Sequence, residues 1–146
     1  MCYTDSYSGE VITLTELEKA RSFFANDLYA TKATGIVIEE VGECYAKCSM
    51  KIERYHLNAV GHVMGGVMFT LADFVFAICT NRNGQMTVTT SSTINYLSSP
   101  KGEMLYGESK LLKDGKTTCF YQIDVTDELG NKIAVINTTG NHIHKK

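Results

Sequence analysis

Positive charge is not in excess in this chain of 146 residues, whose formal net charge is −2. Proteins that bind nucleic acid or an anionic membrane surface usually have a strong positive field, so we expect neither partner. No charge-free apolar run is long enough to span a bilayer. The N-terminus lacks a basic segment followed by an apolar run, and it contains Asp5 and Glu10. The sequence therefore predicts neither a signal peptide nor a membrane anchor.

Cysteine pairs of the C-x-x-C type are absent, and the number of cysteines is odd. The five are Cys2, Cys44, Cys48, Cys79 and Cys119. Reduced thiols in the cytoplasm are the simpler interpretation of this pattern. Cys44 and Cys48 share one face of a predicted strand, but no further ligands lie nearby at a suitable spacing. We therefore expect core residues there and no metal site.

Linkers, repeats and low-complexity segments are also absent, and the single proline is Pro100. Hydrophobic residues make up 44% of the chain and charged residues 21%, so we assign residues 1–146 to one globular domain. Thr13 and Glu16 have the spacing of a capping box, and apolar residues recur at helical intervals after them. These features predict an amphipathic helix over residues 14–28, within an N-terminal helical segment of residues 1–34.

The remaining residues predict an α+β fold. Residues 43–52 alternate between apolar and polar side chains, which indicates the second of two half-buried strands. Residues 63–79 are apolar on nearly every side and predict a long buried helix. Four β-rich runs follow at residues 86–96, 104–113, 117–127 and 132–144, separated by short turn signals. A single antiparallel sheet curled around the buried helix is the most economical packing of these elements.

Two features of the predicted buried helix could carry chemistry. Asp73 is the only acidic or basic residue between His62 and Arg82. Because a buried carboxylate is costly, Asp73 is either a working acid or a hydrogen-bonded or solvent-facing structural residue, and both interpretations stay open. Gly65-Gly66 leaves backbone N–H groups accessible at the positive end of the helix, where they could stabilise an oxyanion, although tight packing is the commoner reason for such a pair.

The spacing of these two features has a geometric consequence. Eight residues separate Gly65 from Asp73, which corresponds to about 12 Å along a helix axis. One reacting carbonyl cannot contact both groups on the same helix. If both act on one carbonyl, they must come from two chains whose helices run antiparallel about a two-fold axis.

Residues 56–76, HLNAVGHVMGGVMFTLADFVF, resemble the pattern H-x-N-x-x-G-x-x-H-G-G followed by a helix with L-A-D or L-V-D. The segments TVTTSSTINYLSSP and LLKDGKTTCFYQIDVTDELGNKIA resemble the strands that follow this helix. The chain is thus similar to hotdog-fold acyl-CoA thioesterases of the phenylacetate-degradation type. The resemblance implies a sheet wrapped around a long central helix, a homodimer that pairs into a dimer of dimers, and hydrolysis of acyl-CoA without a cofactor other than the coenzyme A of the substrate.

The same resemblance assigns catalytic roles to individual residues. Asp73 would be the nucleophile or general base, and the Gly65 N–H would polarise the thioester carbonyl. Asn58 would position the water or the carbonyl, with a turn-capping loop residue as the alternative. Thr89, on the following strand, would hold the water that Asp73 directs.

Substrate contacts follow from the resemblance as well. Met64, Gly66, Met68 and Phe69 would line a pocket between subunits for a small or medium, apolar acyl or aryl group. Met64 stands where the family usually has histidine, so a proton donor or orienting group is lost, unless His62 replaces it. The phosphates of coenzyme A need cations beside the cleft, for which the candidates are Arg82, Lys110, Lys113 and Lys116.

Two alternatives to a thioesterase remain: a non-catalytic acyl-CoA or lipid-binding module, and a hotdog hydratase or dehydratase. Dehydratases of this fold pair a histidine with an acid, so Met64 disfavours them. His142 and His144 lie on one face of the last predicted strand, where we expect solvated side chains and not metal ligands.

Overall fold

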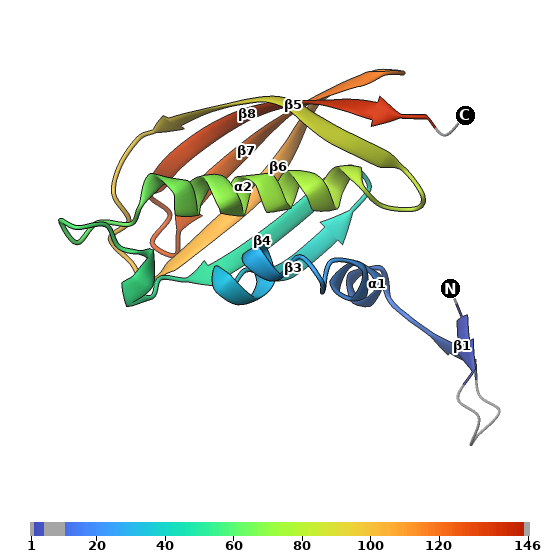
Figure 1. Ribbon diagram of the computed structural model, residues 1–146, viewed down its shortest axis with the longest axis horizontal. Coiled ribbons are helices and arrows are strands. Elements are labelled where there is room, and N and C mark those ends of the chain that lie inside the picture. The colour runs from blue at the N-terminus through green and yellow to red at the C-terminus, as the bar shows by residue number, and fades with distance from the viewer. Residues whose placement is uncertain (1, 5–10, 145–146) are drawn as a thin grey trace.

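The computed structural model describes residues 2–4 and 11–144. Six antiparallel strands form one curled sheet in the order β3-β4-β6-β7-β8-β5, and helix α2 (Gly65–Thr80) lies against its inner face (Figure 1). The strands are β3 (Val37–Gly42), β4 (Tyr45–Lys51), β5 (Met86–Tyr96), β6 (Met104–Asp114), β7 (Thr118–Asp127) and β8 (Lys132–Ile143). The predicted α+β fold, with two strands before the long helix and four after it, is confirmed.

The N-terminal part differs from the expected helical segment. Strand β1 (Cys2–Thr4) pairs with β2 (Val11–Thr13), and helix α1 (Glu16–Phe23) and a π-helical turn, η1 (Tyr29–Ala33), follow. The predicted helix over residues 14–28 is therefore too long, and Leu28 is exposed. Asp5 and Glu10 lie outside the described residues.

The predicted capping box is also wrong by two residues. Thr15 accepts a hydrogen bond from the Glu18 N–H at 3.2 Å, and the Glu18 carboxylate accepts one from the Thr15 N–H at 2.7 Å. The chain contains two overlapping Thr-x-x-Glu spacings, Thr13 with Glu16 and Thr15 with Glu18. The second one caps α1, because Thr13 belongs to β2.

The core lies between α2 and the sheet. Leu71, Val75 and Phe76 of α2 are almost completely buried. Gly107 of β6 permits this close approach, because a Cβ atom there would lie 3.0 Å from Leu71 and 3.1 Å from Val75. Filling this interface excludes water from apolar surface, which is the main stabilising contribution to a fold of this kind.

The cysteines with described side chains are Cys44, Cys48, Cys79 and Cys119, and all four are free thiols. Cys48, Cys79 and Cys119 are buried, as expected for core residues. Cys44, in contrast, lies in the turn between β3 and β4 with a φ angle of 51°, so the prediction that it shares a strand face with Cys48 is wrong.

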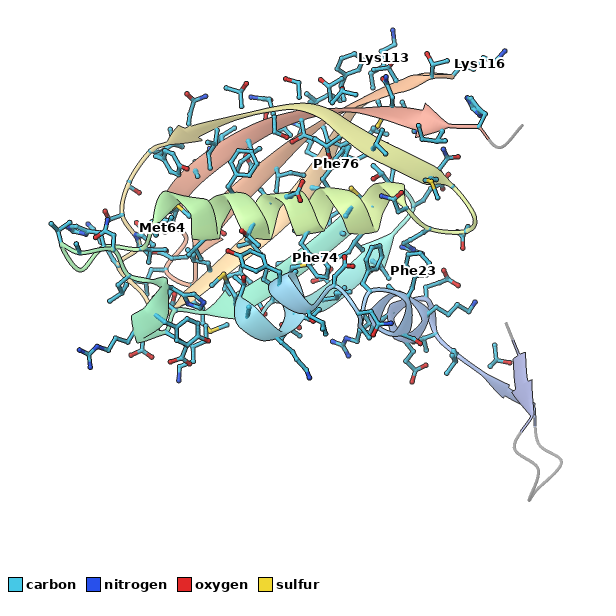
Figure 2. All side chains as sticks on the ribbon, viewed as in Figure 1. Phe23, Met64, Phe74, Phe76, Lys113 and Lys116 are labelled. Carbon is cyan, nitrogen blue, oxygen red and sulfur yellow. The ribbon has the colours of Figure 1, made fainter. Side chains whose placement is uncertain are left out.

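Helix α2 is covered on two sides and open on a third. Figure 2 shows Phe76 and Phe74 on opposite sides of the helix. Phe76 packs against Tyr121 of the sheet, with ring centroids 5.6 Å apart, and Phe74 packs against Phe24 of the N-terminal segment at 5.7 Å.

Some residues of α2 remain exposed or partly exposed in the single chain, among them Gly66, Thr70, Asp73 and Ala77. These four recur at helical spacing, so they form one stripe along the helix, which we call the open stripe. The predicted long buried helix is therefore present, but in the single chain it is open along this stripe. Among the described residues, no helix is long and apolar enough to cross a membrane.

Candidate active site

Asp73 lies in the open stripe, and its side chain is exposed in the single chain. It borders a pocket of about 300 Å³ that is also lined by Asp27, Tyr29 and Thr70. Within residues 2–4 and 11–144, no hydrogen bond engages its carboxylate. Of the two interpretations that the sequence left open, the structure excludes a hydrogen-bonded structural carboxylate within the described residues and shows an acid that faces an open surface.

The electrostatic surroundings of Asp73 favour a base. Partial burial, and secondly the negative charge of Asp27, raise the pKa of the Asp73 carboxyl above its usual range. A carboxylate with a raised pKa accepts a proton more readily than an ordinary one. Asp27 was not singled out from the sequence, because nothing in its own segment shows that the N-terminal residues fold back beside α2.

The N-terminus of α2 presents unpaired backbone donors. Met64 occupies the N-cap position but has no side chain that could cap the helix. The N–H groups of Gly65 and Gly66 donate to no acceptor in the described part of the chain. Such groups carry partial positive charge and are well suited to bind a developing oxyanion.

Tyr96, at the end of β5, lies directly over this helix start. A Cβ atom added to Gly65 would lie 2.6 Å from the Tyr96 hydroxyl oxygen, so any larger residue would displace the tyrosine. The tyrosine side chain is 53% exposed. Its hydroxyl is therefore a second polar group beside the Gly65 N–H, which the sequence did not indicate because the two residues are 31 positions apart.

Asn58 holds the loop that precedes α2. Its side-chain oxygen accepts hydrogen bonds from the N–H groups of Val60 and His62, each at 3.1 Å. The buried His56 supports the same loop, because its carbonyl accepts the Met64 N–H at 2.9 Å. The structure thus shows that Asn58 caps this loop through its side-chain oxygen, and its predicted catalytic contact stays a prediction.

The residues predicted to contact the acyl group do not all face solvent. Met64 and Gly66 are exposed, and Phe69 is partly exposed, so these three border the open end of α2. Met68 is 4% exposed and belongs to the core, which contradicts its assignment to the substrate pocket. Thr89 is exposed on β5 and is paired in register with Gly140 of β8.

The predicted phosphate-binding cations lie far from Met64 in the single chain. Figure 2 shows Met64 at one end of α2, and Lys113 and Lys116 near the opposite end of the sheet. Both lysines are exposed, as is Lys110. Arg82 is different, because it donates to the Gly42 carbonyl at 3.1 Å and to the Glu16 carboxylate at 2.8 Å. Arg82 therefore holds the N-terminal segment onto the domain and is not free for a phosphate.

The geometry constrains what this site can do. Gly65 and Asp73 belong to one uninterrupted helix, so their separation of about 12 Å is fixed. A single chain thus offers an oxyanion-binding helix start at one place and a base at another. Both can act on one carbonyl only when a second chain supplies one of them.

A curled antiparallel sheet around one long helix is the architecture of the hotdog fold. The sequence profile of the thioesterase superfamily matches residues 60–134. A protein of Archaeoglobus fulgidus described as a putative esterase is 34% identical over 103 residues, which cover 70% of this chain and 67% of that protein. The chain therefore belongs to the thioesterase superfamily.

Other relatives extend the match over more of the chain. The acyl-coenzyme A thioesterase PaaI of Escherichia coli is 29% identical over 127 residues, covering 86% of this chain and 90% of that protein. Its solved structure superposes with a TM-score of 0.77 over 90% of this chain and 99% of that chain. A Streptococcus pneumoniae protein described as a hypothetical thioesterase, solved with coenzyme A, gives the same TM-score at 25% identity, over 86% of this chain and 98% of that one.

Proposed function

We propose that the protein hydrolyses the thioester of a small or medium acyl-CoA or aryl-CoA at a site shared by two copies of the chain. The observation that carries this proposal is the pairing, on one rigid helix, of a base with a raised pKa and free helix N–H groups about 12 Å away. The names of the relatives support the reaction, and the coenzyme A bound to the pneumococcal structure supports the substrate class.

In the proposed reaction, Asp73 of one chain removes a proton from water, and the water oxygen attacks the thioester carbonyl carbon. The Gly65 N–H of the other chain donates to the carbonyl oxygen as it becomes negative. The C–S bond then breaks, the coenzyme A thiolate leaves and takes up a proton, and the carboxylic acid remains. Direct attack by the Asp73 carboxylate would give the same products through an anhydride that water hydrolyses.

Strand β5 supports the arrangement of the two chains. It is an edge of the sheet: β8 pairs with one side, and no strand of the described chain pairs with the other. An edge strand of 11 residues is a template for pairing with a second chain. Antiparallel pairing of two β5 strands would set the two α2 helices antiparallel with their open stripes facing, which brings Gly65 of each chain toward Asp73 of the other. The homodimer is thus the proposed active unit, and the dimer of dimers stays a prediction.

Thr89 and the lysines fit the same dimer. Two solved variants of the pneumococcal thioesterase replace an aspartate and a threonine that are 16 residues apart, the separation of Asp73 and Thr89. We assign Thr89 to holding the attacking water. Since the helices are antiparallel, Lys113 and Lys116 of one chain lie toward the Gly65 end of the other, where the coenzyme A phosphates would need them. Free thiols support a reducing, cytoplasmic location.

A panel of acyl-CoA and aryl-CoA esters tests the proposal with wild type, Asp73→Asn and Asp27→Asn. We expect Asp73→Asn to lower kcat by about 10²-fold or more while the substrate still binds, because a general base typically contributes that much. Asp27→Asn is the matched control, since it removes a neighbouring carboxylate of the same pocket, and we expect it to keep most of the activity. Equal turnover by wild type and Asp73→Asn, or binding without turnover by wild type, would show a binding module instead.

A further inference from the structure

A second cluster of chemically active side chains lies at the C-terminal end of α2. Asp114 of β6 is paired in register with Cys119 of β7, and Cys119 is paired with Gly140 of β8. His142, two residues after Gly140, is paired with Thr87 of β5. Neighbouring positions on three strands, β6, β7 and β8, therefore bring together a carboxylate, a thiol and an imidazole, whose potential ligand atoms all lie within 4.8 Å of one another.

Hydrogen bonds fix the orientation of the imidazole. His142 Nε2 lies 2.8 Å from a carboxylate oxygen of Asp114, and Nδ1 lies 2.9 Å from the Thr87 hydroxyl oxygen. The Thr87 hydroxyl itself donates to the carbonyl of Thr80, the last residue of α2, at 3.2 Å. The side chain of His142 is 10% exposed, so the prediction of a solvated histidine is wrong for His142.

This arrangement calls for a positive charge. Because the Thr87 hydrogen points to Thr80, its oxygen accepts from Nδ1–H of His142, and the lone pair of Nε2 then faces the Asp114 oxygen. Two acceptors at 2.8 Å repel each other unless a cation lies between them. The carbonyl end of α2 adds negative potential at the same place. Cys119 Sγ, which donates to the Gly140 carbonyl at 3.7 Å, lies within 4.8 Å of the other two groups, so one cation here would have all three within reach.

We propose that Asp114, Cys119 and His142 bind one divalent transition-metal ion of the Zn²⁺ class. Zinc bonds of about 2.0–2.3 Å require ligand atoms about 3.3–3.8 Å apart, which shifts of less than about 1 Å would achieve here. Carboxylate, thiolate and imidazole are ligands that zinc accepts together. The Thr87 hydroxyl accepts a hydrogen bond from Nδ1 of the histidine and so orients the ring, as is usual for metal-bound imidazole.

The pocket beside the cluster leaves room for a fourth ligand. It has a volume of about 640 Å³, and Asp114 and His142 form part of its wall. Binding would displace the thiol proton of Cys119 to solvent, since burial and secondly Asp114 raise the pKa of that thiol and keep it protonated in the absence of metal. The bound ion would tie three strands together about 10 Å along α2 from Asp73. The cluster is thus distinct from the proposed base and oxyanion-binding groups, although Lys116, proposed for the coenzyme A phosphates, lines the same pocket.

Metal titration of the full-length, chelator-stripped protein tests this proposal. We expect one Zn²⁺ per chain in competition with a chromogenic chelator, and release of a proton on binding. Co²⁺ in place of zinc should give a thiolate-to-cobalt charge-transfer band that Cys119→Ser abolishes. Thr87→Val should weaken zinc binding by about 10- to 100-fold, the usual effect of losing the hydrogen bond that orients a metal-binding histidine.

Matched controls keep the result specific. Cys79→Ser removes another buried thiol, Thr138→Val another buried threonine of the sheet, and His144→Gln another histidine of the C-terminal end. All three should bind zinc as the wild type does. A wild-type chain that takes up no zinc at micromolar concentration, or a cobalt complex without the charge-transfer band, would overturn the proposal on unaltered protein. Zinc binding that Cys119→Ser and His142→Gln leave unchanged would do the same.

Discussion

Subunit complementation tests the shared site directly. Gly65→Pro removes the donor N–H, and Asp73→Asn removes the base. Proline is tolerated at the first position of a helix, where Gly65 lies. Met64 before it has a ψ angle of 135°, within the range that residues preceding proline adopt. The helix should therefore persist in Gly65→Pro, and the loss should be confined to the N–H and to contacts with Tyr96.

The expected recovery follows from counting sites. In a dimer of one Gly65→Pro chain and one Asp73→Asn chain, one site carries both lesions and the other combines an intact glycine with an intact aspartate. Random mixing of equal amounts makes half of the dimers mixed, so the mixture should regain about a quarter of the wild-type kcat per chain. Each variant alone should show about 1% or less, if each group contributes about 10²-fold.

The assay is thioester hydrolysis after denaturation and joint refolding, with subunit exchange verified by tagged chains. Gly65→Ala is the control, because it keeps the N–H but introduces the contact with the Tyr96 hydroxyl that a Cβ makes at 2.6 Å. If Gly65→Ala is as inactive as Gly65→Pro, then displacement of Tyr96 and not loss of the donor explains the defect. Mixed dimers that form but regain nothing would refute the two-chain site.

Three further predictions concern charge and capping. Asp27→Asn should shift the acid limb of the kcat/KM profile to lower pH, because it removes a negative charge that raises the pKa of Asp73; an unshifted limb would contradict this. Asp127 is buried, which alone would raise its pKa, but hydrogen bonds from Asn131, Lys101 and Leu129 lower the pKa to about 2. The ionised carboxylate therefore stabilises the fold fully above pH 3.8, its unfolded pKa, and this contribution is lost as the pH falls toward about 2. Urea titrations should show that the loss of unfolding free energy in Asp127→Asn becomes smaller over this pH range. A loss that stays constant would count against the prediction. Thr15→Ala should cost about 1 kcal/mol of unfolding free energy through loss of the helix cap, whereas Thr13→Ala, the control, should not weaken that cap.

The sheet and the central helix could be predicted because their signals are local. β5 has the predicted limits, and β6, β7 and β8 differ from theirs by one residue at one end. The alternation of apolar and polar residues, together with the turn residues between strands, is enough to predict a strand when one of its faces is buried. The start of α1 could not be chosen in this way, because Thr13 and Thr15 both satisfy the capping pattern and only the pairing of β1 with β2 excludes the first.

The candidate site was predicted in part. Asp73 and Gly65 stood out because a charge and a glycine pair are unusual in an apolar helix. The exposure of Asp73 could also have been anticipated, since Gly66, Thr70, Asp73 and Ala77 are small or polar at helical spacing. The contributions of Asp27 and Tyr96 depend on contacts between distant parts of the chain, and no local pattern reports such contacts. The same holds for Asp114 and His142, which are 28 residues apart.

The rigidity of α2 has a consequence for the behaviour of the proposed dimer. Each helix contributes its first turn to one reaction centre and its middle to the other, so a sliding motion that widens one centre must displace the other by the same amount. The two centres are then mechanically linked without any intervening chain of side chains. Binding of substrate at one reaction centre would therefore change the affinity or the rate at the other reaction centre.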